Sequence, residues 1–415
     1  MRKFLNRLKK IVLLREKNTS LANQIKGYTE KLEFVLDKID TVSKNVDFAN
    51  GLLVEQQSRF LTVMGPERFK SLKPNKDNFI IFSYPQAVSH PTADKICLNI
   101  GDYVQSIAVK NAISKVLKNV NFKYFDRDNL LNYYQENGSD VCIMQGFFPS
   151  RLDWLPNKYI YPVFIGFHLG GAMEYTQKTN GSERIFYKFH KIFPWYFKDK
   201  DIGCRDRRTE AFVRSIGINA YFSRCLSLTL PRREKLKSQN KIFVSCFSYV
   251  LKPLNIFLST KSLENIEYVS PEVNVKSFTK EGYEKLDSID FMLTCKTYLE
   301  KFKNEAKLVI TDRIHIAGPC LAMGIPTIVI KRTENDPRYD IFDGIVKCHT
   351  LDEVIKNGLD LSVEAVDIED LKKMMLKNLE LSVKKEVFHN LTAEEDMYLE
   401  ELRSKINNFS IKNEN

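Results

Sequence analysis

The segment that most constrains the fold is residues 307–330, where two short β-branched runs flank a stretch of small and apolar residues. The runs are KLVIT and PTIVI, and the stretch between them, IHIAGPCLAMG, can form a helix. A strand, helix and strand in this order predict two parallel strands joined by a crossover. The turn after the first strand then lies at the carboxyl edge of the sheet, where α/β proteins bind ligands.

Arg313 and His315 stand in that turn. The N-terminus of a helix offers free N–H groups to an anion, an arginine can grip an oxyanion with two donors, and a histidine can carry a proton near neutral pH. These features predict an anion site. The alternative is an ordinary crossover unit with a surface arginine and a core histidine, and the spacing alone leaves both readings open.

The rest of the chain repeats the alternation of strands and helices. Strands are predicted at 78–85, 122–127, 140–147, 161–169, 217–223, 241–248, 266–270, 307–311 and 326–330, and helices at 101–118 and 283–304. Such alternation predicts parallel, doubly wound sheets. We therefore expect an α/β protein with two Rossmann-like domains facing a cleft and an N-terminal coiled-coil extension.

A chain of 415 residues is long for a single hydrophobic core. Breaks in the pattern predict four parts. They are a basic N-terminus and coiled-coil helix at 1–65, an N-terminal Rossmann-like domain at 76–235, a C-terminal Rossmann-like domain at 240–365, and C-terminal helices with a polar tail at 366–415.

The first part carries about five heptads. Their core positions are Leu14, Asn18, Leu21, Ile25, Tyr28, Leu32, Val35, Ile39, Val42 and Val46. β-Branched residues at position a and the single Asn18 favour a parallel homodimer. Gly27 weakens the helix, and no attractive ion pairs connect the flanking positions, so packing of this helix on its own chain stays an alternative.

Charge is concentrated at the same end. Residues 1–30 supply +6 of the net charge of +11, and residues 2–10 alternate basic with apolar side chains. This pattern is typical of a peripheral contact with an anionic membrane, although a solvated basic tail fits equally well. Zinc-finger spacings and basic–aromatic motifs are absent from the sequence, so no nucleic acid partner is predicted.

Several classes of protein are disfavoured. The eight cysteines are at least 21 residues apart, which excludes CxxC metal or redox motifs and favours reduced thiols. The apolar run IVLL near the start is too short for a signal peptide, and no apolar stretch could span a bilayer. The sequence predicts a cytoplasmic protein, with a possible peripheral location on the inner face of the plasma membrane.

A second basic residue at a strand end is Arg205, followed by Asp206 and by a helix that we expect to be capped near Thr209. Arg205 and Arg313, facing each other across the cleft, would clamp a small polyanion. Arg338 also follows a strand, and Asp102 opens the helix at 101–118. His168 is interpreted as a structural histidine, and Arg207 and Arg208 as surface charges.

Four stretches together resemble the polysaccharide pyruvyl transferase family. They are NIGDYVQSIA, IGCRDRRTEAFVRSIGINAYFSRCLSLTL, AKLVITDRIHIAGPCLAMGIP and NDPR, in the order and spacing of that family. The resemblance implies a fold similar to GT-B glycosyltransferases and transfer of pyruvate from phosphoenolpyruvate onto a sugar diol as a ketal, in surface polysaccharide biosynthesis. It also implies that Arg205, Arg313 and His315 contact the donor phosphate.

On this reading His315 acts on the departing phosphate, Arg205, Arg313 and Arg338 bind the donor, and Asp102 is a candidate base. Neither a metal nor a cofactor is expected. The partners are phosphoenolpyruvate and a glycan or lipid-linked sugar. Two departures from the family pattern are Asp312, where a serine is usual, and Ser223-Arg224-Cys225, where a glycine usually precedes the cysteine.

Two other functions compete with this one. A nucleotide-sugar glycosyltransferase of the same architecture would also use strand-end arginines, although the glutamate pair that retaining members often carry is not seen in the sequence. A non-enzymatic scaffold would leave the cleft vestigial, but the presence of Arg205, Arg313 and His315 argues against it.

Overall fold

The computed structural model describes residues 30, 31, 33–35, 38, 55, 56 and 59–411, with gaps at 86–87, 90–94, 150–151, 171–180, 237, 262 and 277–289. Residues 1–60 and residues 61–415 form separate compact units. In the first unit the described residues are helical, and Val35, a predicted core position of the coiled coil, is 49% exposed in the single chain. The other nine core positions lie outside the described residues, so the coiled coil stays a prediction.

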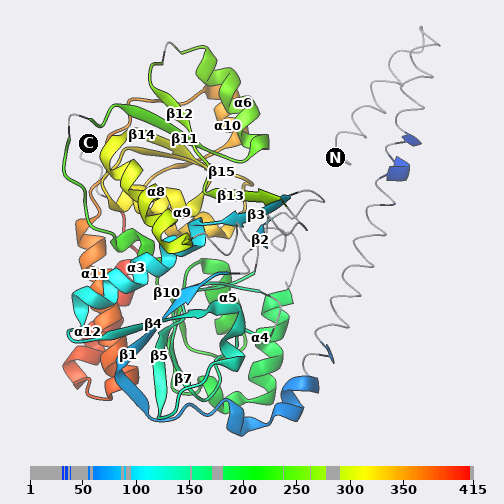
Figure 1. Ribbon diagram of the computed structural model, residues 1–415, viewed down its shortest axis with the longest axis vertical. Helices are drawn as coiled ribbons and strands as arrows, with labels where there is room; N and C mark the ends of the chain where they lie inside the picture. Colours follow the sequence, from blue (N-terminus) through cyan, green and yellow to red (C-terminus); the bar gives the residue numbers. More distant parts are fainter. Residues whose placement is uncertain are drawn as a thin grey trace. The chain divides into compact units, whose positions relative to one another are not determined.

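The first sheet of the second unit contains four parallel strands in the order β4-β1-β5-β7 (Figure 1). The strands are β1 (Pro74–Ser83), β4 (Asn121–Asp126), β5 (Ser139–Ile143) and β7 (Ile160–Val163). The centre of this sheet is buried on both faces, because the run from Phe79 to Phe82 and all of β5 are inaccessible to solvent. Such uninterrupted apolar runs are characteristic of parallel strands that are covered on both sides.

A second parallel sheet has the order β10-β9-β8-β6. Its strands are β6 (Gly146–Phe148), β8 (Ile165–Leu169), β9 (Ile202–Cys204) and β10 (Ala220–Phe222). Two stretches that we had predicted as single strands, 140–147 and 161–169, are therefore each divided between the two sheets. The chain changes sheets near Gly146 and Gly166, whose φ angles of 130° and 73° are readily adopted only by glycine.

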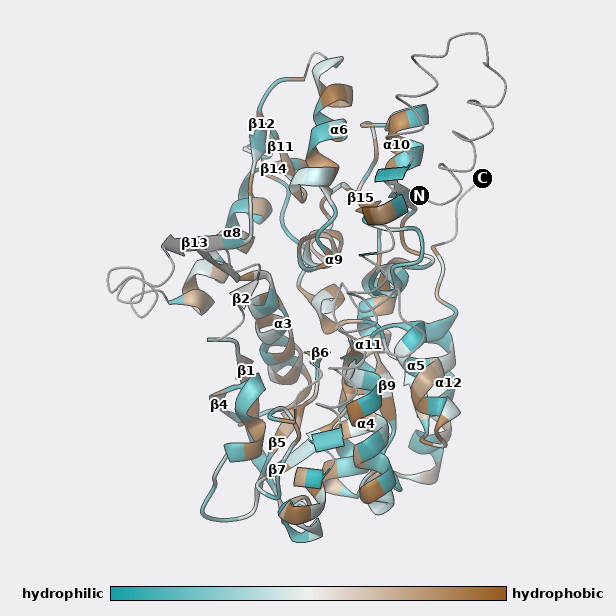
Figure 2. Ribbon diagram, turned by 90° about the vertical axis from the view of Figure 1, so that its right-hand side faces the viewer, coloured by the Kyte–Doolittle hydropathy of each residue, from teal (hydrophilic) through white to brown (hydrophobic). Residues whose placement is uncertain are grey.

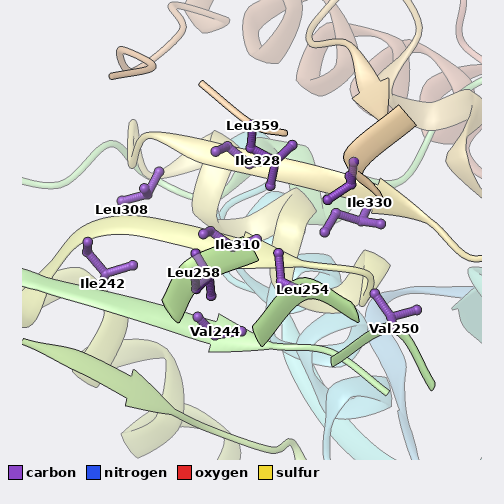
Figure 3. Close-up of a cluster of buried hydrophobic side chains, with 11 residues drawn as sticks. Ile242, Val244, Val250, Leu254, Leu258, Leu308, Ile310, Ile328, Ile330 and Leu359 are labelled. Carbon is purple, nitrogen blue, oxygen red and sulfur yellow. The ribbon is translucent and has the colours of Figure 1, made fainter. Parts of the chain in front are cut away.

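The third parallel sheet has five strands in the order β12-β11-β14-β15-β16. They are β11 (Lys241–Ser245), β12 (Ile266–Tyr268), β14 (Ala306–Thr311), β15 (Thr327–Lys331) and β16 (Cys348–Thr350). Helices α6 (Ser248–Ser259) and α10 (Leu351–Asn357) contact each other, and their apolar side chains pack with those of the strands in a buried cluster (Figure 3). The predicted strand–helix–strand unit at 307–330 is confirmed as β14, α9 (Ile314–Ala322) and β15.

A small antiparallel sheet, β13-β3-β2, was not predicted. Its strands are β2 (Val88–Ser89), β3 (Lys95–Asn99) and β13 (Glu272–Lys276). The strand β3 leads directly into α3 (Gly101–Val116), and β13 follows β12 along the chain. This sheet therefore connects the start of α3 with the segment between β12 and β14 of the third sheet.

Helix α3 contacts elements of both the N-terminal and the C-terminal parts of the second unit. It packs on β1 below and on α9 and α8 (Phe291–Glu305) above (Figure 1). Helix α9 is almost entirely buried and mostly hydrophobic, as the brown ribbon in Figure 2 shows. Helix α9 begins at the carboxyl end of the parallel strand β14, whereas α3 begins directly after β3 of the antiparallel sheet. The first turns of the two helices meet.

The other helices cover the strands of the first two sheets or return to them. Those are α4 (Gly181–Ile192), α5 (Arg207–Ser215), α11 (Glu369–Val383), the π-helical turn η6 (Lys384–Phe388) and α12 (Ala393–Asn407). Helix α11 packs on α3 and α12 on β10, and Arg403 of α12 donates to Asp201 at 2.9 Å. The C-terminal helices thus fold back on the N-terminal strands. The four predicted domain boundaries stay predictions.

Arg224 explains one departure from the family pattern. Its φ of 60° is the left-handed value at which glycine is favoured. The side chain is fully buried, and its guanidinium donates to the carbonyls of Ile341, Asp343 and Ile406 at 2.8–3.1 Å. Arg224 therefore joins the end of β10 to two segments more than a hundred residues away.

Among the described residues, none of the helices combines the length and the apolar character that crossing a bilayer requires.

Candidate active site

The candidate site begins where the N-termini of α3 and α9 touch. Asp102, in the first turn of α3, lies 3.2 Å from His315, in the first turn of α9 (Oδ1 to Nδ1). Gly101 permits this approach: a Cβ atom there would lie 3.3 Å from the Cβ of His315 and 2.9 Å from Oδ1 of Asn99. Two residues predicted from distant motifs are thus brought into direct contact.

The charges around this pair determine its protonation. Burial opposes ionisation of Asp102, but the hydrogen bond with His315 and the nearby His315 and Arg127 lower the pKa of the carboxyl group below its usual value. Burial lowers the pKa of His315, and the charges of Arg205 and Arg338 lower it further, although Asp102 opposes them. Near neutral pH, Asp102 is therefore ionised and His315 is neutral.

This protonation state fixes the roles of the two ring nitrogens. An ionised carboxylate can only accept, so Nδ1 of His315 carries the proton that Asp102 binds. The other nitrogen, Nε2, keeps its lone pair. In the ligand-free chain His315 is thus prepared to accept a proton, whereas the sequence had suggested a residue that donates one.

Arg205 supplies the positive charge of the site. It follows β9, is 2% exposed, and its Nη1 donates to Oε1 of Gln105 at 3.5 Å. Within the described part of the chain, no carboxylate lies within 4.0 Å of this guanidinium, and its Nε has no hydrogen-bond partner. Asp102 and Asp206 interact with this charge only at longer range. A buried cation without a carboxylate in direct contact is costly, and an anion site has this arrangement before its ligand binds.

His168 and Asp206 form a buried pair in the electrostatic environment of Arg205. Asp206 is the N-cap of α5 and accepts from the backbone N–H of Thr209 at 2.8 Å, so the cap is Asp206 and not a residue near Thr209. His168, at the end of β8, bonds through Nδ1 to the same carboxylate. Burial and the charge of Arg205 lower the pKa of His168 to about 4. A neutral, buried His168 agrees with the structural role predicted for it.

Arg313 has different neighbours. Its Nη2 pairs with Glu272 of β13 at 2.8 Å, and its guanidinium lies 3.2 Å from the centre of the Phe247 ring. Arg332, which follows β15, lies against the same ring at 3.8 Å. Arg313 therefore already has an acidic partner, in contrast to Arg205.

Asp312 has a structural explanation in this arrangement. Its carboxylate is fully buried between Nε of Arg313 (3.6 Å) and Nε of Arg332 (3.5 Å), and it accepts from the backbone N–H of Phe247. Burial raises the pKa of Asp312 against the opposing influence of the two arginines. A carboxylate is thus placed here to balance a pair of arginines.

Arg338 lies on η5 (Pro337–Phe342), where its Nε and Nη2 donate to Asp336. Its effect on the pKa of His315 brings it into the same electrostatic environment. Arg207 and Arg208 are more than surface charges: Arg207 contacts Asn407 at 2.8 Å, and Arg208 pairs with the buried Glu183 at 3.0 Å. Arg207 is therefore unsuitable as a neutral control for substitutions in the site.

Three contributors were missed by sequence reasoning. Gln105 lies one helical turn after Asp102, and this spacing could have identified it. Arg332 lies two residues after the predicted strand PTIVI, and a basic residue at a strand end is the same signal that identified Arg205. Phe247 gave no signal, because its contacts come from other strands.

The family model described as "Polysaccharide pyruvyl transferase" matches residues 99–334, more than half of the chain. A search of curated proteins finds no match. Among solved structures, a putative UDP-N-acetylglucosamine 2-epimerase from Listeria monocytogenes is similar over 76% of this chain and 96% of its own, with 10% identity and a TM-score of 0.33. At that level of similarity, the epimerase supports no inference about function.

Proposed function

Because the chain belongs to the polysaccharide pyruvyl transferase family, and is therefore a transferase with a polysaccharide acceptor, we propose that it moves pyruvate from phosphoenolpyruvate to sugar hydroxyls. The observation that supports this donor best is the buried, unpaired Arg205 near the Asp102–His315 pair. The phosphate of the donor is the anion that would complete this environment. Arg313 and Arg338 are proposed as further donor contacts.

The atoms balance without a cofactor. A sugar hydroxyl adds to carbon 2 of the enol while the methylene carbon becomes a methyl group. Loss of phosphate leaves an oxocarbenium-like centre, and a second hydroxyl closes the ketal. Of the two hydroxyl protons, one ends on the methyl group and the other on phosphate. The reaction therefore needs a group that accepts protons and a group that stabilises the phosphate.

The described residues can fill both roles. Nε2 of His315 would accept the proton of the attacking hydroxyl, and Asp102 would hold the ring and stabilise the imidazolium that forms. Arg205 would stabilise the charge on the departing phosphate by preorganised electrostatics. Asp102 then acts as a positioning residue, and His315 takes the role of base that the sequence had assigned to Asp102.

The proposal predicts a change of mass in an acceptor. Incubating the protein with phosphoenolpyruvate and a mixture of lipid-linked or capsule glycans should add one pyruvate ketal and release one phosphate. Mass spectrometry and a phosphate assay measure the two products together. Thermal stabilisation by nucleotide sugars, with none by phosphoenolpyruvate, would instead support the glycosyltransferase alternative.

We also propose that the N-terminal helix forms a parallel homodimer. The prediction is that the full-length chain is a dimer by light scattering and that a chain starting at Leu61, where the second compact unit begins, is a monomer. If both are monomeric, the helix packs on its own chain and the dimer proposal is wrong.

A dimer would place two copies of the basic residues 2–10 at one end of the helix. We propose that these residues hold a cytoplasmic protein at the inner face of the plasma membrane, near lipid-linked acceptors. Co-sedimentation with anionic vesicles that weakens as salt is added tests this electrostatic mechanism.

A further inference from the structure

Gln105 is, after Asp102, the second residue of α3 that contacts a proposed site residue. It is one helical turn beyond Asp102, and residues three apart on a helix share a face. Asp102 contacts His315 from the C-terminal strands, and Gln105 contacts Arg205 from the N-terminal strands. One face of α3 therefore sets the positions of both groups.

The contact between Gln105 and Arg205 has a defined chemistry. Gln105 is 1% exposed, and the guanidinium has only donors, so the amide must present its oxygen to Nη1. A glutamate would reach the same point and bind the guanidinium more strongly, but it would also neutralise the charge. A glutamine at this position orients the arginine and leaves its charge unbalanced.

The other buried arginines in the described residues have different partners. Arg127, Arg313 and Arg403 each pair with a carboxylate within 2.9 Å, and Arg224 donates to several backbone carbonyls. Within this group, Arg205 is the arginine held by a single neutral side chain. Its Nε, like that of Arg313, has no hydrogen-bond partner. The difference is what a site for an external anion requires.

Little space is left in the cavity beside the Gln105 amide. The cavity beside Gln105, lined also by Tyr84, Ser106 and Gln145, has a volume of only about 10 Å³. Such a space holds at most one water molecule, so a charge placed at Gln105 would gain little hydration from this side. Arg205 is the cation that Gln105 contacts, and a carboxylate at this position would pair with it.

We propose that Gln105 is a positioning residue that holds Arg205 by a neutral amide, so that the phosphate of the donor supplies the missing counter-ion. This inference deepens the proposed function and rests on it for the identity of the anion. The role of Gln105 is to keep the charge of Arg205 available while fixing its direction.

Two substitutions separate charge from hydrogen bonding. Gln105→Glu keeps the acceptor and adds a negative charge, whereas Gln105→Met removes the acceptor and leaves the charge unchanged. We expect Gln105→Glu to fold at least as stably as the wild type and to bind phosphoenolpyruvate and inorganic phosphate more than about tenfold more weakly. Gln105→Met, which leaves the charge of Arg205 available but removes the contact that orients it, should weaken binding measurably but less than Gln105→Glu does.

Calorimetry with inorganic phosphate and with phosphoenolpyruvate measures both effects, and KM for the donor should rise with kcat less affected. Gln135→Glu, whose side chain contacts Lys123 at 2.8 Å, is the matched control for adding one charge elsewhere. Equal phosphate binding by the wild type and Gln105→Glu would overturn the inference while leaving the proposed function intact. A wild type that binds neither anion and forms no product would instead reject the proposed function.

Discussion

Replacing Arg205 is expected to abolish most donor binding without lowering stability. Loss of a charge-assisted contact costs on the order of 1.5–3 kcal/mol, which corresponds to roughly 10- to 150-fold in affinity. The guanidinium is buried without a carboxylate partner, so the ligand-free fold gains little from it. Arg205→Met should therefore melt at or above the wild-type temperature while binding phosphoenolpyruvate much more weakly.

Two further variants make this result specific. Arg214→Ala removes an arginine from α5, the helix that follows Arg205 in the chain. The Arg214 side chain is 57% exposed and pairs with Glu210 on the surface, so donor binding should not change. Arg313→Ala should weaken binding less than Arg205→Met, because Arg313 already pairs with Glu272. It should also destabilise the fold, because it leaves Asp312 between fewer positive charges. Donor binding that is unaffected in Arg205→Met would contradict the assignment.

We expect stability to be kept or raised when Arg205 is replaced and lowered when Arg313 is replaced. This difference could not be derived from the sequence. Both residues follow short strands and were predicted to clamp a small polyanion together. Their counter-ions come from segments far away, since Glu272 belongs to an antiparallel sheet that the sequence did not reveal. Periodicity predicts where a strand ends, but it does not predict which charges meet there.

Fold prediction succeeded where a run of apolar residues was uninterrupted. The strands β14 and β15 and the helix between them were predicted closely, because apolar patterning and the Met323–Gly324 turn delimit them. It failed at 140–147 and 161–169, where a continuous apolar run passes from one sheet to another. Both sheets bury these residues, so the hydrophobic pattern does not change where the chain crosses.

The contact between Asp102 and His315 shows what a motif does contribute. Arg313-Ile314-His315 was selected as a turn at the carboxyl edge of a sheet, where α/β proteins bind ligands, and Gly101-Asp102 as the loop that opens a helix. Their direct contact depends on the absence of a side chain at Gly101. The direction of proton transfer, however, depends on burial and on Arg205, Arg338 and Asp102 together, and only the structure brings these together.

The pH dependence of the reaction should distinguish a base from an acid at His315. Its pKa lies below the usual 6.5, because burial and two arginines disfavour the imidazolium. If neutral His315 is the base, kcat/KM is constant near neutral pH and falls as the pH drops below the pKa of His315. If protonated His315 were required, kcat/KM would instead fall as the pH rises above that pKa.

Substitutions at the pair should change this profile in different ways. His315→Gln should lower kcat by about 10²–10⁴-fold and remove the acidic limb due to the histidine, while the titration of the donor phosphate remains. Asp102→Asn should lower the rate and move the acidic limb to still lower pH, because the carboxylate that favours the imidazolium is gone. Measuring donor binding across the same pH range separates loss of affinity from loss of catalysis. An acidic limb that persists unchanged in Asp102→Asn would show that Asp102 does not act through His315, because a carboxylate in direct contact with the ring must alter its titration.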